Sequence, residues 1–346
     1  MKKVLELNNP PITSFPALAG LLGIVYNEKT VPWFVNNFIQ IVTIKEFEFI
    51  NEYYSNFYDD LPNNRVPQQA LCPFIKTLIL NRDSVDNDYI EHFIEKQIYD
   101  LYYIEIYLDL YFISVSEFYH REHFMHPVLI HGYDSEKKVF YIADFFKNRY
   151  ESVETSYEEI KDSAKTIRYE SRVLNKDYYS FRFDTIKMFK YVKSNYKFSI
   201  TLFKKVLYDY LNEKDSFEKY CCYPMICDKK VIYGIGIYRA LRYNVENANE
   251  YIDVRPFYVV YDHKSAMIVR ITYLEQNGYV KEDDSDILKH KFIELTSETK
   301  KMISIILKFN ITRDRRLKNK IINRICELEE LERFAIRRLL DSIVDL

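Results

Sequence analysis

The sequence predicts an α+β protein with a mixed first half and a largely helical second half. Two apolar runs flank a polar turn at 134–138, which is typical of a β-hairpin. In the second half, apolar residues recur every three or four positions, as they do in amphipathic helices. Charged residues at 151–172, or the polar run at 175–177, mark the change of pattern. We therefore expect two domains, at 1–175 and 176–346.

Local patterns predict the elements in chain order. Proline at the first position, where its missing N–H costs nothing, predicts a buried helix at 16–26. A second helical region is expected at 31–53, and extended chain at 102–112. Acidic residues suited to a first helical turn predict a helix that begins near Ser156. The other expected elements are a turn at 59–69, a strand or short helix at 72–80, and helices at 84–96, 183–193, 201–213, 235–248, 254–278, 285–310 and 315–344.

Composition and charge argue against several classes of function. The 346 residues carry 49 Lys and Arg against 51 Asp and Glu, which disfavours binding of nucleic acid through global positive charge. Only six glycines are present, and neither GxGxxG nor GxxxxGK[ST] occurs, so nucleotide-binding folds that need those loops are not expected. Hydrophobic residues make up 48% of the chain, which is enough to build a folded core.

The cysteines indicate neither a zinc site nor a disulfide framework, so a cytoplasmic location is expected. The uncharged stretch at 7–27 looks like the core of a signal peptide. However, Pro16 interrupts it, and its prolines and asparagines exclude a membrane span. The five cysteines are Cys72, Cys221, Cys222, Cys227 and Cys326.

The segment from His126 to Asp144 carries the most chemical information. It begins His-Pro-Val-Leu-Ile-His-Gly-Tyr-Asp and ends Val-Phe-Tyr-Ile-Ala-Asp. In a hairpin, the start of the first strand lies beside the end of the second, so His126 is expected next to Asp144. The carboxylate can then orient the imidazole through its Nδ1–H, which supplies the base and the orienting group of a nucleophilic triad. The nucleophile must come from elsewhere, usually from a helix N-terminus.

These motifs resemble papain-fold cysteine peptidases, above all the amino-terminal family of butirosin biosynthesis protein H, which is related to double-glycine leader peptidases. The resemblance rests on the His-x-Val-x-x-x-Gly-Tyr-Asp run, the Ala-Asp ending and the acid-containing stretch at 108–111, and it covers about residues 5–175. It implies a papain-like catalytic domain at 1–175 and a mainly helical domain at 176–346. A fainter resemblance to longer relatives rests on Arg255, Pro256, Phe257, His263, Lys264, Met267 and Arg270.

The resemblance also implies a function. Relatives found beside peptide and polyketide assembly lines take an acyl group from a carrier-protein thioester and pass it to an amine. We therefore expect an ATP-independent amide synthetase of secondary-metabolite biosynthesis, with a carrier protein and a small amine or diamine as partners. No cofactor is expected, because the phosphopantetheine arm of the carrier holds the substrate. The basic run at 313–320 is either a solvated helix start or a surface for the acidic carrier.

The sequence departs from the family at the nucleophile. Relatives carry a cysteine near the start of the first helix, but this chain has none between Met1 and Leu71, and Ala17 occupies the equivalent position. Either Ala17 is an engineered replacement of the catalytic cysteine, or the chain is a natural pseudoenzyme. In the active form, a thiolate at position 17 would attack the thioester, with His126 as general base and Asp144 orienting it.

Other residues at this end of the chain are candidates for the missing nucleophile and oxyanion donor. Ser14 offers a hydroxyl but precedes the helix. Cys72 precedes His126 in the order that the family requires, and Gln68 or Gln69 could serve it as oxyanion donor, although its apolar neighbours indicate a core residue. For position 17, the oxyanion donors considered are Asn8 and Asn9, because Pro11 stands where papain-type enzymes keep glutamine.

Each histidine also has a structural interpretation. His126 and Asp144 can simply pin a hairpin, and His131 is expected to point to the opposite face of the strand as a structural residue. His120, His123 and His126 are spaced as on one face of a helix, but they lack further ligands for a metal. The cysteines at 221–227 are interpreted as packing residues.

Two functions from other classes remain open. A peptidase or amidase would resolve the acyl-enzyme with water instead of an amine. A catalytically inactive scaffold would bind a carrier protein or a peptide.

Overall fold

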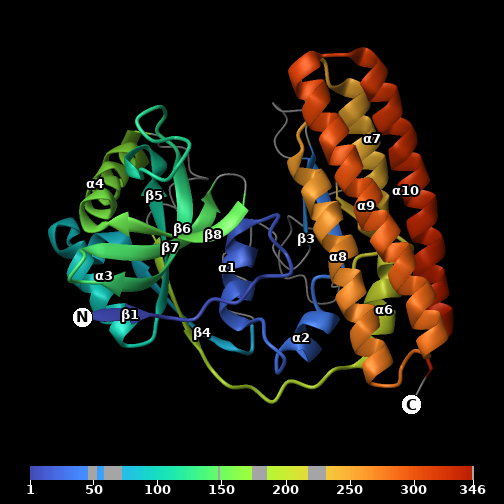
Figure 1. Cartoon of the computed structure of the whole chain (residues 1–346), viewed down its shortest axis with the longest axis horizontal. Coiled ribbons are helices and arrows are strands. Elements are labelled where there is room, and N and C mark those ends of the chain that lie inside the picture. Colours follow the sequence, from blue (N-terminus) through green and yellow to red (C-terminus); the bar gives the residue numbers. More distant parts are fainter. Residues whose placement is uncertain (46–52, 58–71, 147–148, 174–184, 217–230, 345–346) are drawn as a thin grey trace. The chain divides into compact units, whose positions relative to one another are not determined.

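The computed structural model divides the chain into two compact units (Figure 1). The sheet unit comprises Met1–Asn27 and Val66–Asn195, and the helical unit comprises Glu28–Arg65 and Tyr196–Leu346. The units are therefore not the continuous halves expected, because the segment after Asn27 groups with the later helices. The structure describes residues 1–45, 53–57, 72–146, 149–173, 185–216 and 231–344.

The helices and strands follow one another along the described chain in this order: β1 (Lys2–Val4), α1 (Pro16–Val25), α2 (Val31–Asn36), β2 (Ile41–Lys45), β3 (Tyr53–Phe57), β4 (Ile75–Asn81), α3 (Ile90–Tyr99), β5 (Tyr103–Asp109), β6 (Met125–Asp134), β7 (Val139–Phe146), β8 (Arg149–Ser156), α4 (Tyr157–Val173), β9 (Thr185–Tyr191), α6 (Ile200–Leu211), β10 (Ile232–Tyr233), α7 (Ile237–Asn247), α8 (Arg255–Gln276), α9 (Glu282–Thr312) and α10 (Arg315–Ser342).

The sheet unit is built on an antiparallel sheet in the order β4-β9-β5-β6-β7-β8, with β1 paired to β6. The predicted hairpin is confirmed as β6 and β7, and the predicted extended chain at 102–112 contains β5. The helix expected near Ser156 is α4. It begins with two glutamates in its first turn, and Tyr157 stacks on Phe140 of β7 at 4.2 Å between ring centroids. Helices α3 and α4 pack against β5, while α1 packs against β6 and β7.

Two predicted helices are wrong. The region 31–53 contains the short helix α2 and then strand β2, because the β-branched run Ile41-Val42-Thr43-Ile44 favours extended chain. The region 183–193 contains strand β9, which lies between β4 and β5. The apolar side chains of this segment are buried between neighbouring strands, whereas their spacing in the sequence alone suggested one face of a helix. The turn expected at 59–69 lies outside the described residues.

The helical unit contains the five later helices, all at positions that the sequence predicted. A small antiparallel sheet in the order β10-β2-β3 joins the segment after Asn27 to this unit. Helix α9 packs against both α8 and α10, and α10 packs against α6 and α7. Within the part of the chain that the structure describes, no helix combines the length and apolar character needed to cross a membrane.

A polar network lies inside the helical unit. The Glu332 carboxylate of α10 accepts hydrogen bonds from Lys264 at 2.5 Å, from the Tyr210 hydroxyl at 3.0 Å and from the Tyr238 hydroxyl at 2.7 Å. His263 stacks on Tyr210 at 4.7 Å, and its Nδ1 lies 3.2 Å from Lys264 Nζ. All five side chains are fully buried, so the network ties four helices together without solvent.

Candidate active site

His126 and Asp144 form the hydrogen-bonded pair that the sequence predicts. His126 Nδ1 lies 2.6 Å from Asp144 Oδ2. The Asp144 side chain is 1% exposed and the His126 side chain 21% exposed. When Nδ1–H donates to the carboxylate, the lone pair of the imidazole is left on Nε2. The pair can therefore act as a base whose tautomer is fixed.

The hairpin explains why these two residues meet. Leu129 of β6 pairs with Ala143 of β7 at the end of the ladder, so the same register sets Asp144 opposite Val128. His126 is two residues from Val128 and points to the same face, so it meets Asp144 diagonally. The ring of Phe124 stacks on His126 with 5.5 Å between centroids and limits how the imidazole can turn. The pairing of the two strands thus positions both residues, and the Phe124 ring restricts the imidazole.

One oxygen of Asp144 has no hydrogen-bond partner in the part of the chain that the structure describes. Its Oδ1 is buried and accepts no hydrogen bond from the described residues. The nearby Tyr150 hydroxyl of β8 is also buried without a partner among those residues, and burial followed by the charge of Asp144 raises the pKa of Tyr150. Unpaired buried polar groups cost stability. Such groups are retained more readily at a functional site than in a core that serves packing alone.

Ala17 is the second residue of α1 and is half-buried. This helix begins at Pro16 as predicted, and its N-cap Phe15 makes no side-chain capping bond. A methyl group added at Gly20, one turn later, would lie 3.6 Å from Leu129 of β6 and 3.6 Å from the Tyr150 hydroxyl. Helix α1 therefore packs on the strands that carry the dyad. The structure brings His126 and Asp144 together, and the place of Ala17 beside them remains a proposal.

The other nucleophile candidates have different surroundings. Cys72 is buried, and this burial raises the pKa of its thiol to about 12. A thiol with such a pKa is almost wholly protonated at neutral pH, which fits a core residue. Ser14 precedes the first residue of α1, as expected from the sequence. Gln68 and Gln69 lie outside the described residues.

Asn8, one of the two candidate oxyanion donors, is hydrogen-bonded at the far end of α1. Its backbone N–H and its side-chain amide both donate to the carbonyl of Gly23, at 2.7 Å and 3.2 Å. Gly23 lies near the other end of the helix, so the amide is engaged away from position 17. Asn9 is exposed. The backbone N–H of Ala17 belongs to the first turn, where helical N–H groups have no partner within the helix.

His131 has the structural role predicted for it. Its Nδ1 lies 2.9 Å from the Leu5 carbonyl and its Nε2 lies 2.7 Å from the Ser152 hydroxyl. Burial lowers the pKa of His131, which keeps the ring neutral. The register of β6 against β7 shifts between Ile130 and Gly132, so His131 sits at an irregularity in the ladder. It joins β6 to the chain after β1 and to β8.

The helical face proposed for three histidines is absent, since turns occupy 116–121 and β6 begins at Met125. No group of three or more His, Cys, Asp or Glu that could hold a metal occurs among the described residues. His123 instead pairs with Asp109, with 2.6 Å between Nδ1 and Oδ2. The sequence interpretation missed this second pair. The signal available in the sequence was Asp109 within the predicted extended segment 102–112, where the structure ends β5.

The remaining sequence candidates lie elsewhere. The cysteines at 221–227 are outside the described residues. In the basic run, Arg316 pairs with Asp314, and Lys318 donates to the Glu246 and Ala248 carbonyls. These contacts stabilise helix ends and reduce the free positive charge of the run.

Sequence comparison adds no family to these observations. The chain matches no known family model, and it matches no curated protein. The family resemblance therefore rests on the sequence motifs, and the geometry shows a mixed architecture of helices with an antiparallel sheet.

Proposed function

We propose that the sheet unit is a papain-like acyl-transfer unit. In this proposal, a cysteine at position 17 takes an acyl chain from a carrier-protein thioester, and an amine then receives it. The observation that carries the proposal is the His126–Asp144 pair, with its short hydrogen bond, its buried carboxylate and its partly exposed imidazole. The chain as it stands has alanine at position 17, so it lacks the nucleophile.

The mechanism assigns one task to each position. Nε2 of His126 removes the proton of the thiol at position 17, and Asp144 stabilises the imidazolium that forms. The thiolate attacks the carrier thioester, and the carrier thiol leaves. An amine then attacks the acyl-enzyme, His126 takes a proton from it, and the amide is released. Converting a thioester to an amide is downhill, so no nucleotide is required.

The first turn of α1 supports this assignment. Its backbone N–H groups and the positive end of the helix dipole favour a thiolate at position 17. Pro16 at the start fixes the backbone for the helix without removing a useful hydrogen bond. The same N–H groups are suited to an oxyanion that forms on the acyl carbon.

The test restores the nucleophile. Ala17→Cys is incubated with an acyl-carrier thioester and a diamine, and intact-protein mass spectrometry follows the acyl-enzyme and the product. We expect an acyl adduct on Cys at position 17 and amide formation. The unaltered chain is the matched control, because the methyl group of Ala17 offers no nucleophile, and no adduct is expected there. His126→Ala in the Ala17→Cys background should slow loading by about 10²-fold or more.

Two results would count against the proposal. If Ala17→Cys folds normally but forms neither adduct nor amide, acyl transfer is refuted. If the adduct forms but only water resolves it, the chain is a hydrolase, and the acceptor part of the proposal is wrong.

A further inference from the structure

Positive charge is concentrated where α9 meets α10. Between Thr299 and Cys326 the chain holds nine Lys and Arg and one acidic residue, Asp314, although the chain as a whole carries a net charge of -2. In Figure 1 this connection lies at the end of the helical bundle opposite the end at which α10 finishes. We call residues 300–324, together with the neighbouring loop 248–252, the basic tip. The proposed acyl transfer gives the basic tip no role.

Carboxylates neutralise only part of the basic tip. Glu298 pairs with Lys301 and with Arg324, and Asp314 pairs with Arg316. The other six cations form no ion pair with the residues that the structure describes, and five of the six are exposed. These six are Lys300, Lys308, Arg313, Arg315, Lys318 and Lys320, of which only Lys318 is half-buried. The basic tip therefore keeps positive charge available to an external anion.

The stability of α10 does not account for these charges. A helix dipole favours acidic residues in the first turn and basic residues in the last. Helix α9 follows this rule, since three acidic residues occupy its first turn. Helix α10 begins instead with Arg315 and Arg316, and its first turn contains no acidic residue. The cations at this helix start oppose the dipole, which favours a role in binding over a role in helix stability.

Exposed apolar side chains accompany the charges. Ile311, in the last turn of α9, is 83% exposed, the largest value among the large apolar side chains of the described residues. Leu307, one turn earlier, is 43% exposed, and Tyr251 is 57% exposed. An isoleucine left in water forgoes the free energy that burial supplies. The basic tip thus presents aliphatic and aromatic groups among its cations.

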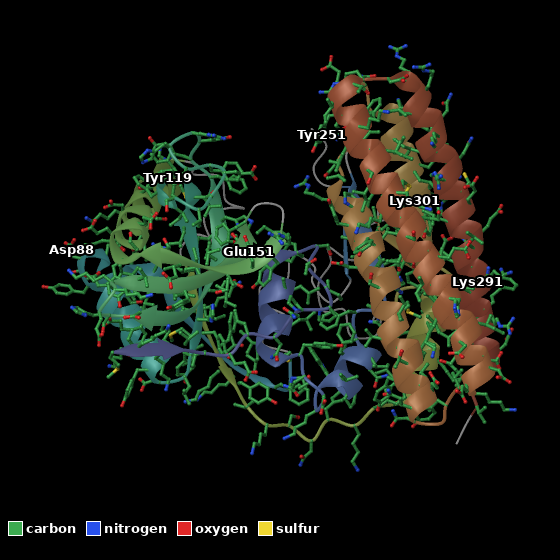
Figure 2. All side chains as sticks on the ribbon, viewed as in Figure 1. Asp88, Tyr119, Glu151, Tyr251, Lys291 and Lys301 are labelled. Atoms are coloured by element: carbon green, nitrogen blue, oxygen red, sulfur yellow. The ribbon has the colours of Figure 1, made fainter. Side chains whose placement is uncertain are left out.

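Hydrogen bonds hold these groups at one end of the bundle. The Asn310 side chain accepts the Ile252 N–H at 2.8 Å and donates to the Ile252 carbonyl at 2.9 Å. Ile311 and Tyr251 are the chain neighbours of these two residues, and Figure 2 labels Tyr251 at this end. Lys318 of α10 donates to a carbonyl of the same loop at 2.7 Å. The end of α9, the loop and the start of α10 therefore form one fixed surface.

We propose that the basic tip docks the protein on an anionic membrane surface. Lys and Arg are attracted to anionic headgroups, while apolar side chains enter the boundary between headgroups and acyl chains. A nucleic acid or an acidic carrier would also pair with the cations, but neither requires an isoleucine exposed among them. Docking inserts Ile311 and Leu307 and sets the cations against the lipid phosphates. This contact does not depend on the proposed acyl transfer.

Vesicle co-sedimentation of the full chain measures the contact. Binding to phosphatidylcholine vesicles that contain phosphatidylglycerol should exceed binding to phosphatidylcholine alone by at least about 10-fold. Raising the salt from about 0.1 M to about 1 M should weaken this binding, because the screening length falls from about 10 Å to about 3 Å. Equal binding to the two kinds of vesicle, or binding to neither, would overturn the proposal.

Two isoleucines of α9 provide matched variants. Ile293 is 52% exposed and precedes Ile311 by about five helical turns, on the same face and about 27 Å away. Ile311→Ser should weaken vesicle binding by about fivefold or more because it removes an inserted side chain, whereas Ile293→Ser should leave binding unchanged. Both side chains are exposed, so neither change should disturb folding. Equal losses in the two variants would place the contact along the helix and contradict docking through the tip.

The charges are tested in the same way. Arg315→Gln should weaken vesicle binding by about fivefold, whereas Lys291→Gln removes a charge from the other part of α9 and should have no effect. The unaltered chain is also titrated with a DNA duplex. If it binds the duplex more tightly than the vesicles, and Ile311→Ser leaves both affinities unchanged, the tip binds nucleic acid and the membrane proposal is wrong.

Ile311→Trp measures insertion directly. The natural Trp33 is 6% exposed, so a change of emission on adding vesicles reports the new indole. We expect a shift to shorter wavelength and quenching by brominated lipid for Ile311→Trp, and neither effect for Ile293→Trp. Vesicle binding without any shift at position 311 would show that the side chain stays in water, which contradicts the proposed docking.

Discussion

The two units of the chain use histidine beside carboxylate in contrasting ways. In the sheet unit, His126 and His123 each pair with a buried aspartate through Nδ1 and keep part of the ring exposed. In the helical unit, His263, Lys264 and Glu332 lie in one network that is completely closed to solvent. The first arrangement leaves an imidazole that solvent can reach, and the second does not while the unit stays folded.

The contrast shows that burial, more than residue type, separates a candidate proton-transfer group from a structural one. Burial and the neighbouring Lys264 and Arg270 lower the pKa of His263 well below its ordinary value, so its ring stays neutral. Its Nε2–H donates to the Ile39 carbonyl at 2.9 Å, and Arg270 Nη2 donates to the Asn37 carbonyl at 2.5 Å. These side chains of α8 hold the segment between α2 and β2 within the helical unit.

The largest effect is expected from breaking the buried network. Glu332→Ala leaves the Lys264 ammonium buried without its carboxylate and removes the acceptor of two tyrosine hydroxyls. We expect a loss of about 3–5 kcal/mol in the free energy of unfolding of the helical unit. Urea unfolding of the full chain, followed by hydrogen exchange at α8 and α10 amides, measures it.

A surface pair in the same unit provides the control. Lys291 and Glu294 of α9 are 3.3 Å apart, both are exposed, and Lys291 is labelled in Figure 2. Glu294→Ala should change the unfolding free energy by less than about 1 kcal/mol. The double variant Lys264→Met with Glu332→Met should lose less than the two single variants together, because the second change removes the group that the first leaves unpaired. Equal losses for Glu332→Ala and Glu294→Ala would contradict the contrast between the units.

An intermediate effect is expected from the tyrosines of the network. Tyr238→Phe removes a 2.7 Å hydrogen bond to Glu332, and we expect a loss of about 1.5–3 kcal/mol in the free energy of unfolding because the acceptor is charged.

Burial, and then the charge of Glu332, hold the pKa of Tyr210 and Tyr238 well above the ordinary value of 10.0. Above pH 10 the unfolded chain loses these protons while the folded chain keeps them, so stability falls as pH rises. Each tyrosine contributes about 1.4 kcal/mol per pH unit there.

The difference between variants isolates this alkaline effect. Burial lowers the pKa of Lys264 from 10.5, so this lysine makes stability rise with pH in the range below 10.5, opposite in sign to the tyrosines. Stability of the unaltered chain is therefore compared with that of Tyr210→Phe and Tyr238→Phe between pH 8 and 11, by urea titration. The variants should show a shallower alkaline decline, and identical slopes would refute the assignment.

The sequence predicted the parts of the fold that depend on local pattern. In the later helices and in the β6–β7 hairpin, the spacing of apolar residues and the turn or cap residues are both contained in the local sequence. The predicted hairpin was enough to place His126 beside Asp144. The local pattern of 183–193 predicts a helix, but the burial of this segment comes from strands more than 70 residues away in the chain, which no local pattern contains. The Asp109–His123 pair was missed for a similar reason, since the connection that closes it holds only a short 3-10 helix, Leu110–Phe112, and turns, which no repeating pattern announces.

The smallest effect is expected at Tyr150, where the sheet unit differs from the helical unit in how it treats a buried tyrosine. Its hydroxyl is buried without a hydrogen-bond partner among the described residues, whereas those of Tyr210 and Tyr238 both reach Glu332. Tyr150→Phe removes an unpaired polar group without removing a bond, so the unfolding free energy should stay the same or rise by up to about 1 kcal/mol. Hydrogen exchange at β7 and β8 amides in urea measures this change. A loss comparable to that of Tyr238→Phe would show that the hydroxyl has a partner, and would remove one of the two unpaired polar groups that mark the surroundings of Asp144 as a site.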